Sequence, residues 1–489
     1  MESNMARNVL IIAQSFPPLN NIAARRFGFL TPYMESHGWR PWVLTTEAEG
    51  TLPLCVSDTQ IIRLGRHPQA TSSGNGKQRE DSTRISDSAR RGLAPPIDWF
   101  RRAVAALGLR LRAVDYTCLT WSRLVLRQLA ELERQLPPID LVMGTFGPAA
   151  SLWLARRLAS RWGVPWIADF RDLAALRPDD RHRVSRWLDG RIERHLLRTA
   201  SGITSVSPTW AKILEETYQL PTKVIYNGWD RALVAPDVAQ PPPAVREQPK
   251  QPSATVDVQP GQPRAAILQN DFAARPDACL AEAVSPANAA SAPYLYYAGR
   301  WYPERVRAAS VVLAAMVGRP DLHWLIRSLG PTSAEMGIAV EAKALGVADR
   351  IHFRPPCDAR RVALEARHSL ANLVLDDPDC RDRWSRGTLT GKFLELVAAK
   401  RPVLAVTRPD SDMAPILGTT RKGEVCSDDA AIGRFLDRIS RDPAVFRGDG
   451  RAIESFSKAA QAALLSRFLA RFVARPSILA ETRTLRRVA

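Results

Sequence analysis

Short apolar runs alternate with longer stretches of mixed polarity along most of the chain. The first run, at 8–13, is almost purely aliphatic, which is typical of a strand buried on both faces of a parallel sheet. Apolar residues recur at helical spacing between the runs. Further strands are predicted at 41–45, 60–64, 140–145, 164–169, 202–206 and 223–226. This alternation predicts a doubly wound α/β domain.

Two polar segments interrupt the pattern and indicate how the chain divides. Residues 66–94 are rich in serine and almost lack large apolar side chains, so we expect a disordered insertion. Residues 235–292 are rich in proline, alanine and glutamine, so we expect a flexible linker. The first α/β domain is therefore assigned to 1–234.

Beyond the linker the alternation starts again. Strands are predicted at 294–298, 323–327, 350–353, 371–375 and 402–406, with helices between them. We assign a second α/β domain to 293–452. The last amphipathic stretch, 453–473, leads into a basic tail, and we expect the segment 453–489 to begin with a helix that packs back on the first domain.

Length and charge narrow the functional classes. A chain of 489 residues, 45% of them hydrophobic, can bury two cores, which agrees with two domains. The formal net charge of +18 indicates a basic surface that meets phosphates, nucleic acid or an anionic bilayer. We find no nucleic-acid-binding motif and no aromatic stacking platform, so nucleic acid is not an expected partner. No apolar run has the length of a signal peptide or a membrane span, which favours a cytoplasmic protein.

Cysteine usage argues against two further classes of site. The six cysteines are scattered, without C-x-x-C pairs and without histidines at ligand spacing. Neither a zinc site nor a disulfide framework is therefore expected, and the cysteines are predicted to be reduced thiols.

One stretch, 99–136, combines arginines with apolar residues. Basic residues interleaved with Leu, Val and Ala fit a helix that lies on an anionic membrane surface. A helix packed in the core with an arginine-rich solvent face is the alternative, and the sequence slightly favours it. The arginines concerned are Arg101, Arg102, Arg110, Arg112, Arg123, Arg127 and Arg134.

The segment GTLTGKFLELVAAKRPVLA, at 387–405, carries the most informative candidate chemistry. A short polar loop leads into an apolar helix, and a strand follows. In an open α/β sheet this places a helix N-terminus at the carboxyl edge, where an anionic ligand can bind. Lys392 would add positive charge for a diphosphate, and Glu395 could accept from a ribose hydroxyl. A solvated i,i+3 pair is the alternative.

Six motifs follow one another along the chain, namely SFPPLNNIAARR, GTFGPAAS, GVPWIADFRD, VIYNGWD, YYAGRWYPER and GTLTGKFLELVAAKRPVLAV. In this order they resemble the GT-B glycosyltransferases, and within that fold the large retaining family 4. The resemblance implies two Rossmann-like domains that face each other across a cleft. It also implies a nucleotide-sugar donor in the second domain, an acceptor in the first, and no cofactor or bound metal. The D-x-D at 377–379 is accordingly interpreted as a loop.

For the donor, the resemblance assigns cations to the motif YYAGRWYPER. Arg300 comes just after a strand end, where the family binds the donor diphosphate, and a guanidinium suits phosphate oxygens. Arg305 lies near the second cation of the family, although the usual spacing points to Val306. The alternative for both arginines is a surface position.

The loop and helix of the last motif supply the other predicted donor contacts. By resemblance these are Lys392, the backbone N–H groups near Thr390 and Gly391, and Glu395, which aligns with the second acid of the paired-glutamate motif. The first acid falls on Gly387. Related enzymes with a K-x-x-E version of this loop look similar, so we interpret the difference as subfamily variation.

The segment ADFRD is the predicted catalytic contribution of the first domain. Asp169, Arg171 and Asp172 follow a strand, so they should emerge at a carboxyl edge that faces the cleft. A carboxylate there could orient an acceptor hydroxyl and take its proton, while Arg171 could hold an acceptor phosphate. The equally weighted alternative is a structural Arg–Asp pair that holds the loop.

Asn20 and Asn21 occupy the loop after the first strand, which is glycine-rich in many relatives. Asparagine tolerates left-handed backbone geometry better than most residues, so the loop shape could be retained. Arg25 and Arg26 follow on the first helical turn. They are predicted either to face the acceptor or to lie on a solvated helix face.

Together these features predict a hexosyl- or related transferase that moves a sugar from a nucleotide-sugar donor to a glycan or polyprenyl-linked acceptor. The expected setting is bacterial surface polysaccharide synthesis, and contact with the inner membrane face depends on the membrane interpretation of 99–136. Two alternatives remain open, a catalytically inactive GT-B-like binding subunit and a nucleotide-sugar epimerase. The absent first glutamate and the absent loop glycines motivate the first alternative.

Overall fold

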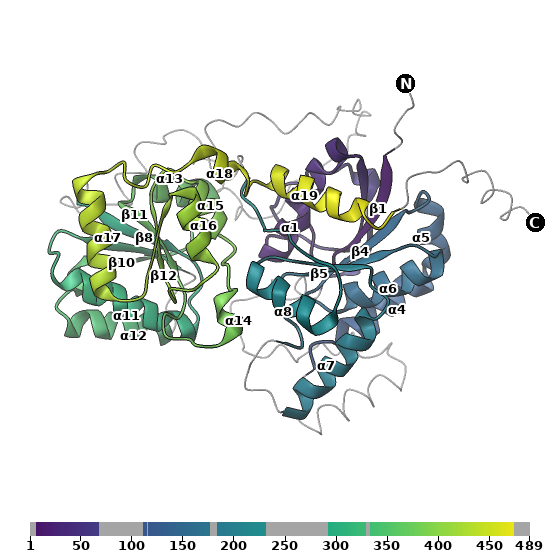
Figure 1. Ribbon diagram of the computed structural model, residues 1–489, viewed down its shortest axis with the longest axis horizontal. Helices are drawn as coiled ribbons and strands as arrows, with labels where there is room; N and C mark the ends of the chain where they lie inside the picture. Colours follow the sequence, from purple (N-terminus) through teal and green to yellow (C-terminus); the bar gives the residue numbers. More distant parts are fainter. Residues whose placement is uncertain are drawn as a thin grey trace, which may run out of the picture.

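The computed structural model describes residues 6–67, 111–114, 116–176, 183–230, 292–328 and 333–473. These residues form two α/β domains side by side, each a parallel sheet covered by helices on both faces (Figure 1). The expected insertion and linker lie almost entirely outside these ranges, as do Arg101, Arg102 and Arg110. The architecture is the predicted one, with two Rossmann-like domains.

The N-terminal sheet has seven parallel strands in the order β3-β2-β1-β4-β5-β6-β7. The strands are β1 (Arg7–Ile12), β2 (Trp39–Glu47), β3 (Ile61–Arg66), β4 (Leu141–Thr145), β5 (Trp166–Phe170), β6 (Gly202–Ser205) and β7 (Thr222–Val224). The helices are α1 (Ile22–Leu30), α4 (Tyr116–Arg127), α5 (Leu129–Gln135), α6 (Ala150–Trp162), α7 (Arg183–Leu197) and α8 (Pro208–Tyr218). The order reverses between β1 and β4, so ligand-facing loops are expected at the carboxyl ends of these strands.

The C-terminal sheet has six strands in the order β10-β9-β8-β11-β12-β13. The strands are β8 (Tyr294–Ala298), β9 (His323–Arg327), β10 (Ile351–Arg354), β11 (Ala371–Leu375), β12 (Val403–Val406) and β13 (Gly423–Cys426). The helices are α11 (Pro303–Val317), α12 (Ser333–Ala344), α13 (Ala359–His368), α14 (Arg383–Arg386), α15 (Phe393–Ala398), α16 (Met413–Thr420) and α17 (Asp429–Arg441). Only β13 was absent from the sequence prediction, because this short edge strand has no apolar run.

Alternation along β1 divides the N-terminal core into two layers. Leu10 and Ile12 belong to the cluster on the side of α4 and α6, whereas Val9 and Ile11 belong to the cluster on the side of α1. Because both faces are covered, β1 is apolar on both faces, which explains the uninterrupted run in the sequence.

The chain returns to the first domain through α18 (Gly450–Glu454) and α19 (Lys458–Ala470), which crosses above β1 and α1 in Figure 1. Apolar residues of α19 complete the core layer around Val9 and Ile11. The single amphipathic stretch expected at 453–473 is thus two helices. The break lies at Ser457, whose hydroxyl caps α19 by accepting from the Ala460 N–H.

The described part of the arginine-rich stretch packs against the protein. Trp121 and Val125 of α4 are buried in the core, and the Trp121 indole donates to the Leu64 carbonyl at 2.8 Å. Arg123 and Arg127 are exposed on the opposite side. This arrangement matches the alternative of a packed helix with a basic solvent face. Among the residues placed by the structure, no helix is long and apolar enough to cross a membrane.

Candidate active site

The two domains meet where α1 faces the loop before α15. A side-chain carbon on Gly391 would overlap the Ile22 side chain at the start of α1. In the same region Arg25 Nη1 lies 3.4 Å from Glu395 Oε1, and both side chains are partly buried. Two predicted donor residues, Gly391 and Glu395, therefore lie opposite the start of α1, which carries the predicted acceptor-side residue Arg25.

Lys392 lies at the inner edge of this junction. Its Nζ donates to the Ala298 carbonyl, at the end of β8, over 3.4 Å. Burial lowers the pKa of Lys392, and the charge of Arg25 lowers it further, whereas Glu395 opposes the shift. A partly buried ammonium with a single long hydrogen bond in the described structure can take an anionic partner, whose negative charge would raise its pKa again.

The helix that follows Lys392 is short. The segment α15 has six residues, and the N–H groups of Phe393 and Leu396 already donate to the carbonyls of Thr390 and Lys392. A helix this short adds little macrodipole. Most of the positive charge at this edge therefore comes from side-chain cations, and the role predicted for the N–H groups near Thr390 and Gly391 stays a prediction.

Arg300 and Arg305 have different surroundings. Arg305 Nη1 donates to the Arg300 carbonyl at 2.7 Å and to the Tyr297 hydroxyl at 3.1 Å, and its guanidinium lies 4.6 Å from the centre of the Tyr302 ring. Arg305 thus holds the loop after β8. Arg300, on the same loop, has an exposed side chain. Of the two, only Arg300 has an exposed side chain, and its contact with the donor stays a prediction.

Gly387, where the family has its first acid, is in contact with the other domain. A side-chain carbon there would overlap the indole of Trp210, on α8. The Trp210 indole donates to the Trp384 carbonyl at 2.9 Å, and its ring stacks on that of Trp384 with centroids 5.9 Å apart. The space that a Glu side chain would occupy is therefore filled by Trp210 from the N-terminal domain.

A second contact between the domains caps α8. The Thr209 N–H and hydroxyl donate to the two carboxylate oxygens of Asp412 at 2.8 and 2.7 Å. Asp412 is buried, and its burial raises its pKa, although the hydrogen bonds from Thr209 oppose the shift. An acid of the C-terminal domain thus satisfies the N-terminus of a helix in the first domain.

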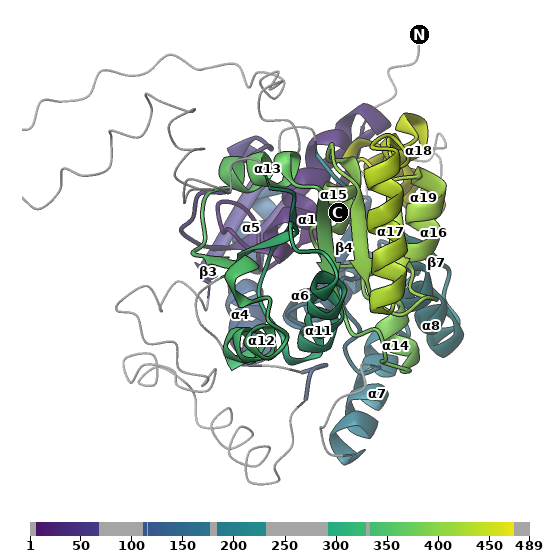
Figure 2. The ribbon, with the colours of Figure 1, turned by 90° about the vertical axis from the view of Figure 1, so that its left-hand side faces the viewer.

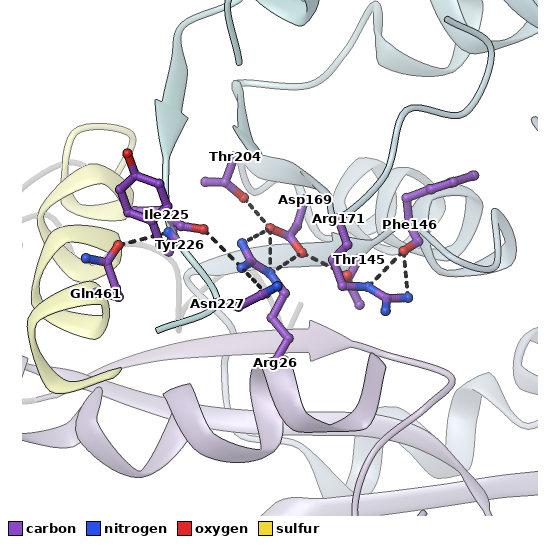
Figure 3. A network of polar contacts seen from close by, with 10 residues as sticks. All are labelled: Arg26, Thr145, Phe146, Asp169, Arg171, Thr204, Ile225, Tyr226, Asn227 and Gln461. Atoms are coloured by element: carbon purple, nitrogen blue, oxygen red, sulfur yellow. Dashed lines mark hydrogen bonds and ion pairs between the residues drawn. The ribbon is translucent and has the colours of Figure 1, made fainter. Parts of the chain in front are cut away.

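Asp169 lies at the end of β5, where it is fully buried (Figure 3). Arg26 donates to it through Nε at 2.9 Å and through Nη2 at 2.6 Å. The hydroxyls of Thr145 and Thr204 donate at 2.8 and 2.7 Å. The four donors occupy both carboxylate oxygens, so the prediction that Asp169 faces the acceptor needs correction. Its role in this structure is to neutralise a buried arginine.

The Arg26 side chain is buried, so it lies neither on a solvated helix face nor on a surface open to an acceptor. Its Nη1 donates to the Ile225 carbonyl and to Asn227 Oδ1, both at 3.0 Å. The guanidinium thereby joins α1, β5 and the chain after β7 (Figure 3). A structural Arg–Asp pair was one of the two sequence-based alternatives. The partner of Asp169 is Arg26 from α1, not the neighbouring Arg171.

Arg171 holds the loop after β4. Its Nη2 donates to the carbonyls of Phe146 and Gly147 at 2.9 and 2.7 Å, and its Nε donates to Phe146 at 3.2 Å. Burial lowers the pKa of Arg171 to about 10, so it stays protonated at neutral pH. Asp172 is partly buried, and its charge acts on Arg171. Of the three predicted catalytic residues, Asp172 is the carboxylate not enclosed in the core.

The asparagine loop differs from the expectation. Asn21 has an extended backbone, with φ −137°, and its Oδ1 caps α1 by accepting from the Ala24 N–H at 2.8 Å. Neither Asn20 nor Asn21 is among the described residues with positive φ. The tolerance of asparagine for left-handed geometry is therefore not used at these two positions. Asparagine is favoured here as a helix cap.

Lys458, at the start of α19, is a charged residue that sequence reasoning missed. It is buried, its Nζ donates to the Asn227 carbonyl at 2.7 Å and lies 5.4 Å from the centre of the Phe29 ring. Burial lowers its pKa to about 8, while the charges of Glu395 and Asp230 oppose the shift. Nothing in the local pattern distinguishes it from a solvated helix lysine.

In the residues that the structure describes, no group of three or more His, Cys, Asp or Glu side chains could hold a metal ion. At 377–379 the Asp379 N–H donates to Asp377 Oδ1 at 3.0 Å, and the Asp379 carboxylate pairs with Arg307. This D-x-D is a loop, as interpreted from the sequence.

Comparison with known proteins places the fold. Residues 86–228 match the family model described as a glycosyl transferase 4-like domain. Sucrose-phosphate synthase from Thermosynechococcus elongatus is similar in structure with a TM-score of 0.57 at 15% identity, over 95% of this chain and 98% of that one. A glycosyltransferase from Rickettsia africae ESF-5 gives 0.55 at 13% identity, over 96% and 100%. Anabaena HepE, solved with UDP and glucose, gives 0.54 at 12%, over 95% and 100%. No curated protein matches the sequence at a significant level.

Proposed function

We propose that this chain, which has the GT-B fold and carries a glycosyl transferase 4-like domain at 86–228, is a glycosyltransferase that uses a nucleotide-sugar donor. The proposed acceptor is a glycan or a polyprenyl-linked saccharide, and the proposed setting is bacterial surface polysaccharide synthesis. The proposed location is the cytoplasmic side of an anionic membrane, which the net charge of +18 supports. No metal or other cofactor is included in the proposal.

One observation carries the proposal. The partly buried Lys392 ammonium and the Glu395 carboxylate lie at the carboxyl edge of the C-terminal sheet, opposite Arg25 of the other domain. The exposed Arg300 follows the same strand whose last carbonyl accepts from Lys392. Two cations beside one acid suit a nucleoside diphosphate, with the cations on phosphate oxygens and Glu395 accepting from a ribose hydroxyl.

The proposed reaction breaks the bond between the sugar C1 and the diphosphate oxygen, and the bonding electrons leave with the diphosphate. Arg300 and Lys392 would stabilise the charge that develops there, which is usually the largest contribution to rate in such a transfer. The acceptor hydroxyl forms the new bond to C1, and its proton would pass to Asp172. Retention of configuration at C1 is part of the proposal by family resemblance only.

Anabaena HepE has been solved in complex with UDP-glucose, so uridine nucleotides are the first ligands to test. The thermal unfolding temperature should be measured with UDP, GDP, ADP and their sugar conjugates, since a ligand that binds only the native state raises it. Donor turnover is then followed as release of the nucleoside diphosphate in the presence of glycan and polyprenyl-diphosphate acceptors. Stabilisation by one nucleotide together with acceptor-dependent release supports a transferase.

Other outcomes distinguish the alternatives. Nucleotide binding without release over a broad acceptor panel would favour the non-catalytic binding subunit that Gly387 motivates. Conversion of the donor sugar without an acceptor would favour an epimerase. Absence of any stabilisation would remove the donor-site assignment. Lys400→Ala, at an exposed position just after α15, is the control for effects of lost charge alone.

A further inference from the structure

The helix α7 projects from the N-terminal domain, and it is the lowest element in both Figure 1 and Figure 2. It contains two acids, Asp189 and Glu193, and both are buried. Asp189 accepts from the N–H groups of Arg112 and Ala113, each at 2.9 Å. Glu193 accepts from the Ala175 N–H at 3.1 Å and from the Tyr218 hydroxyl. Both negative charges of α7 are therefore enclosed in the domain.

The outer side of the same helix is basic and apolar. We define the α7 face as the exposed residues Arg183, Val184, Trp187, Arg191, Arg194 and Arg198. Trp187 is 59% exposed and Val184 is 45% exposed, one helical turn apart. Between 183 and 198 no exposed position carries an acid. This face thus combines an unbroken positive charge with a large exposed indole.

The indole is held at the surface by one of these cations. The Arg191 guanidinium lies 5.2 Å from the centre of the Trp187 ring, one turn along the helix. The amphipathic Trp ring is common at membrane interfaces, where it lies at the level of the lipid headgroups, and an adjacent arginine can contact their phosphates. Met336 and Val340 on α12 are also exposed, but their helix offers no arginine beside them, because none lies within 333–344.

We propose that the α7 face docks the protein on an anionic lipid bilayer. The arginines would contact phosphate headgroups, and Trp187 and Val184 would enter the boundary between headgroups and acyl chains. A soluble polyanion could pair with the arginines equally well, but it has no apolar region in which Trp187 and Val184 could be buried. A bilayer is therefore favoured. The proposal gives a location to the membrane contact proposed above, and its test does not depend on sugar transfer.

The test is co-sedimentation of the purified full chain with phosphatidylcholine vesicles, with and without phosphatidylglycerol. Binding is expected only to the anionic vesicles and should weaken with added salt. Arg194→Gln and Arg198→Gln should each lower the partition coefficient about fivefold. Trp187→Ala should lower it about tenfold. The chain has 13 Trp, so sedimentation is preferred to bulk fluorescence.

Matched controls lie in the C-terminal domain. Arg434→Gln and Arg441→Gln, both exposed on α17, remove the same charge, and Met336→Ala removes an apolar side chain as exposed as Trp187. The controls should bind vesicles as the wild type does. Thermal unfolding of each variant checks that the fold is retained, which is expected because the altered side chains are exposed.

Three results would overturn the proposal. Equal binding to neutral and anionic vesicles would remove the role of the arginines. An equal loss of vesicle binding in the α17 control variants would mean that the effect depends only on the net charge of the protein. Binding to dextran sulfate in solution that matches vesicle binding, with no effect of Trp187→Ala on either, would identify a polyanion site and not a membrane site. If the wild-type protein bound anionic vesicles but no nucleotide or nucleotide sugar, the proposed function would fail while this inference would stand.

Discussion

The carboxyl edges of the two sheets use charge in opposite ways. At the N-terminal edge, Asp169 and Arg26 are buried and form an ion pair. Both side chains also have hydrogen-bond partners on other segments. At the C-terminal edge, Lys392 and Glu395 each have one long polar contact with the residues that the structure describes, and Arg300 is exposed. The first domain thus uses this charge pair to hold its segments together, whereas the proposed donor site of the second domain consists of charges with fewer partners in the described structure.

The largest expected effect tests the structural role of the first edge. Asp169→Ala should lower the free energy of unfolding by about 3–5 kcal/mol, because it leaves the Arg26 guanidinium buried without its carboxylate. Chemical denaturation measures this change. Arg300→Ala is the matched control and should leave stability nearly unchanged. A stable Asp169→Ala variant with impaired turnover would instead restore Asp169 as a catalytic residue.

The second prediction concerns the open edge. Arg300→Ala and Lys392→Ala should each lower kcat by about 10²–10³, because each removes a cation from the departing diphosphate. Nucleoside diphosphate release under donor saturation measures kcat, and Lys400→Ala should behave as the wild type. Wild-type kinetics in both variants would show that the C-terminal edge does not bind the donor in the proposed way.

A third prediction tests whether the missing acid was replaced by a contact. Gly387→Glu should destabilise the protein by about 1–3 kcal/mol, because the new side chain overlaps Trp210. Adding Trp210→Ala should recover part of that loss, which makes the two effects non-additive. Chemical denaturation of the two single variants and the double variant measures the free energies of unfolding that this double-mutant cycle compares. Additive losses would mean that Gly387 and Trp210 do not depend on each other.

The smallest expected effect concerns Lys458, at the junction of the two domains. Its pKa of about 8 in the folded state lies below its ordinary value of 10.5, so the unfolded state binds more protons between these values. The stability of the wild type should therefore rise, relative to Lys458→Met, as the pH increases from about 8 towards 10. Urea denaturation across this range measures the difference. Lys400→Met, at an exposed position, should show no such trend, and a flat difference for Lys458→Met would mean that its ammonium is not desolvated.

Much of the donor edge could be predicted from local sequence, and much of the acceptor edge could not. Lys392 and Glu395 lie one helical turn apart, so their common position follows from helical spacing. Arg26 and Asp169 are 143 positions apart. No local pattern indicated their pairing, and Arg171 was the nearer candidate. The cap formed by Asn21 was accessible from the sequence, because Asn before an apolar helical stretch is an N-cap signal.

The sequence by itself determined the two α/β domains and the places of nearly all strands, because apolar periodicity acts over a few neighbouring residues. The tertiary structure alone decided which charges remain available. Asp169 is neutralised by α1, Trp210 fills the space beside Gly387, and the acids of α7 are enclosed while its arginines are exposed. Each of these outcomes depends on atoms brought together from distant segments, and burial among them changes the energy of a charge far more than its neighbours in the chain do.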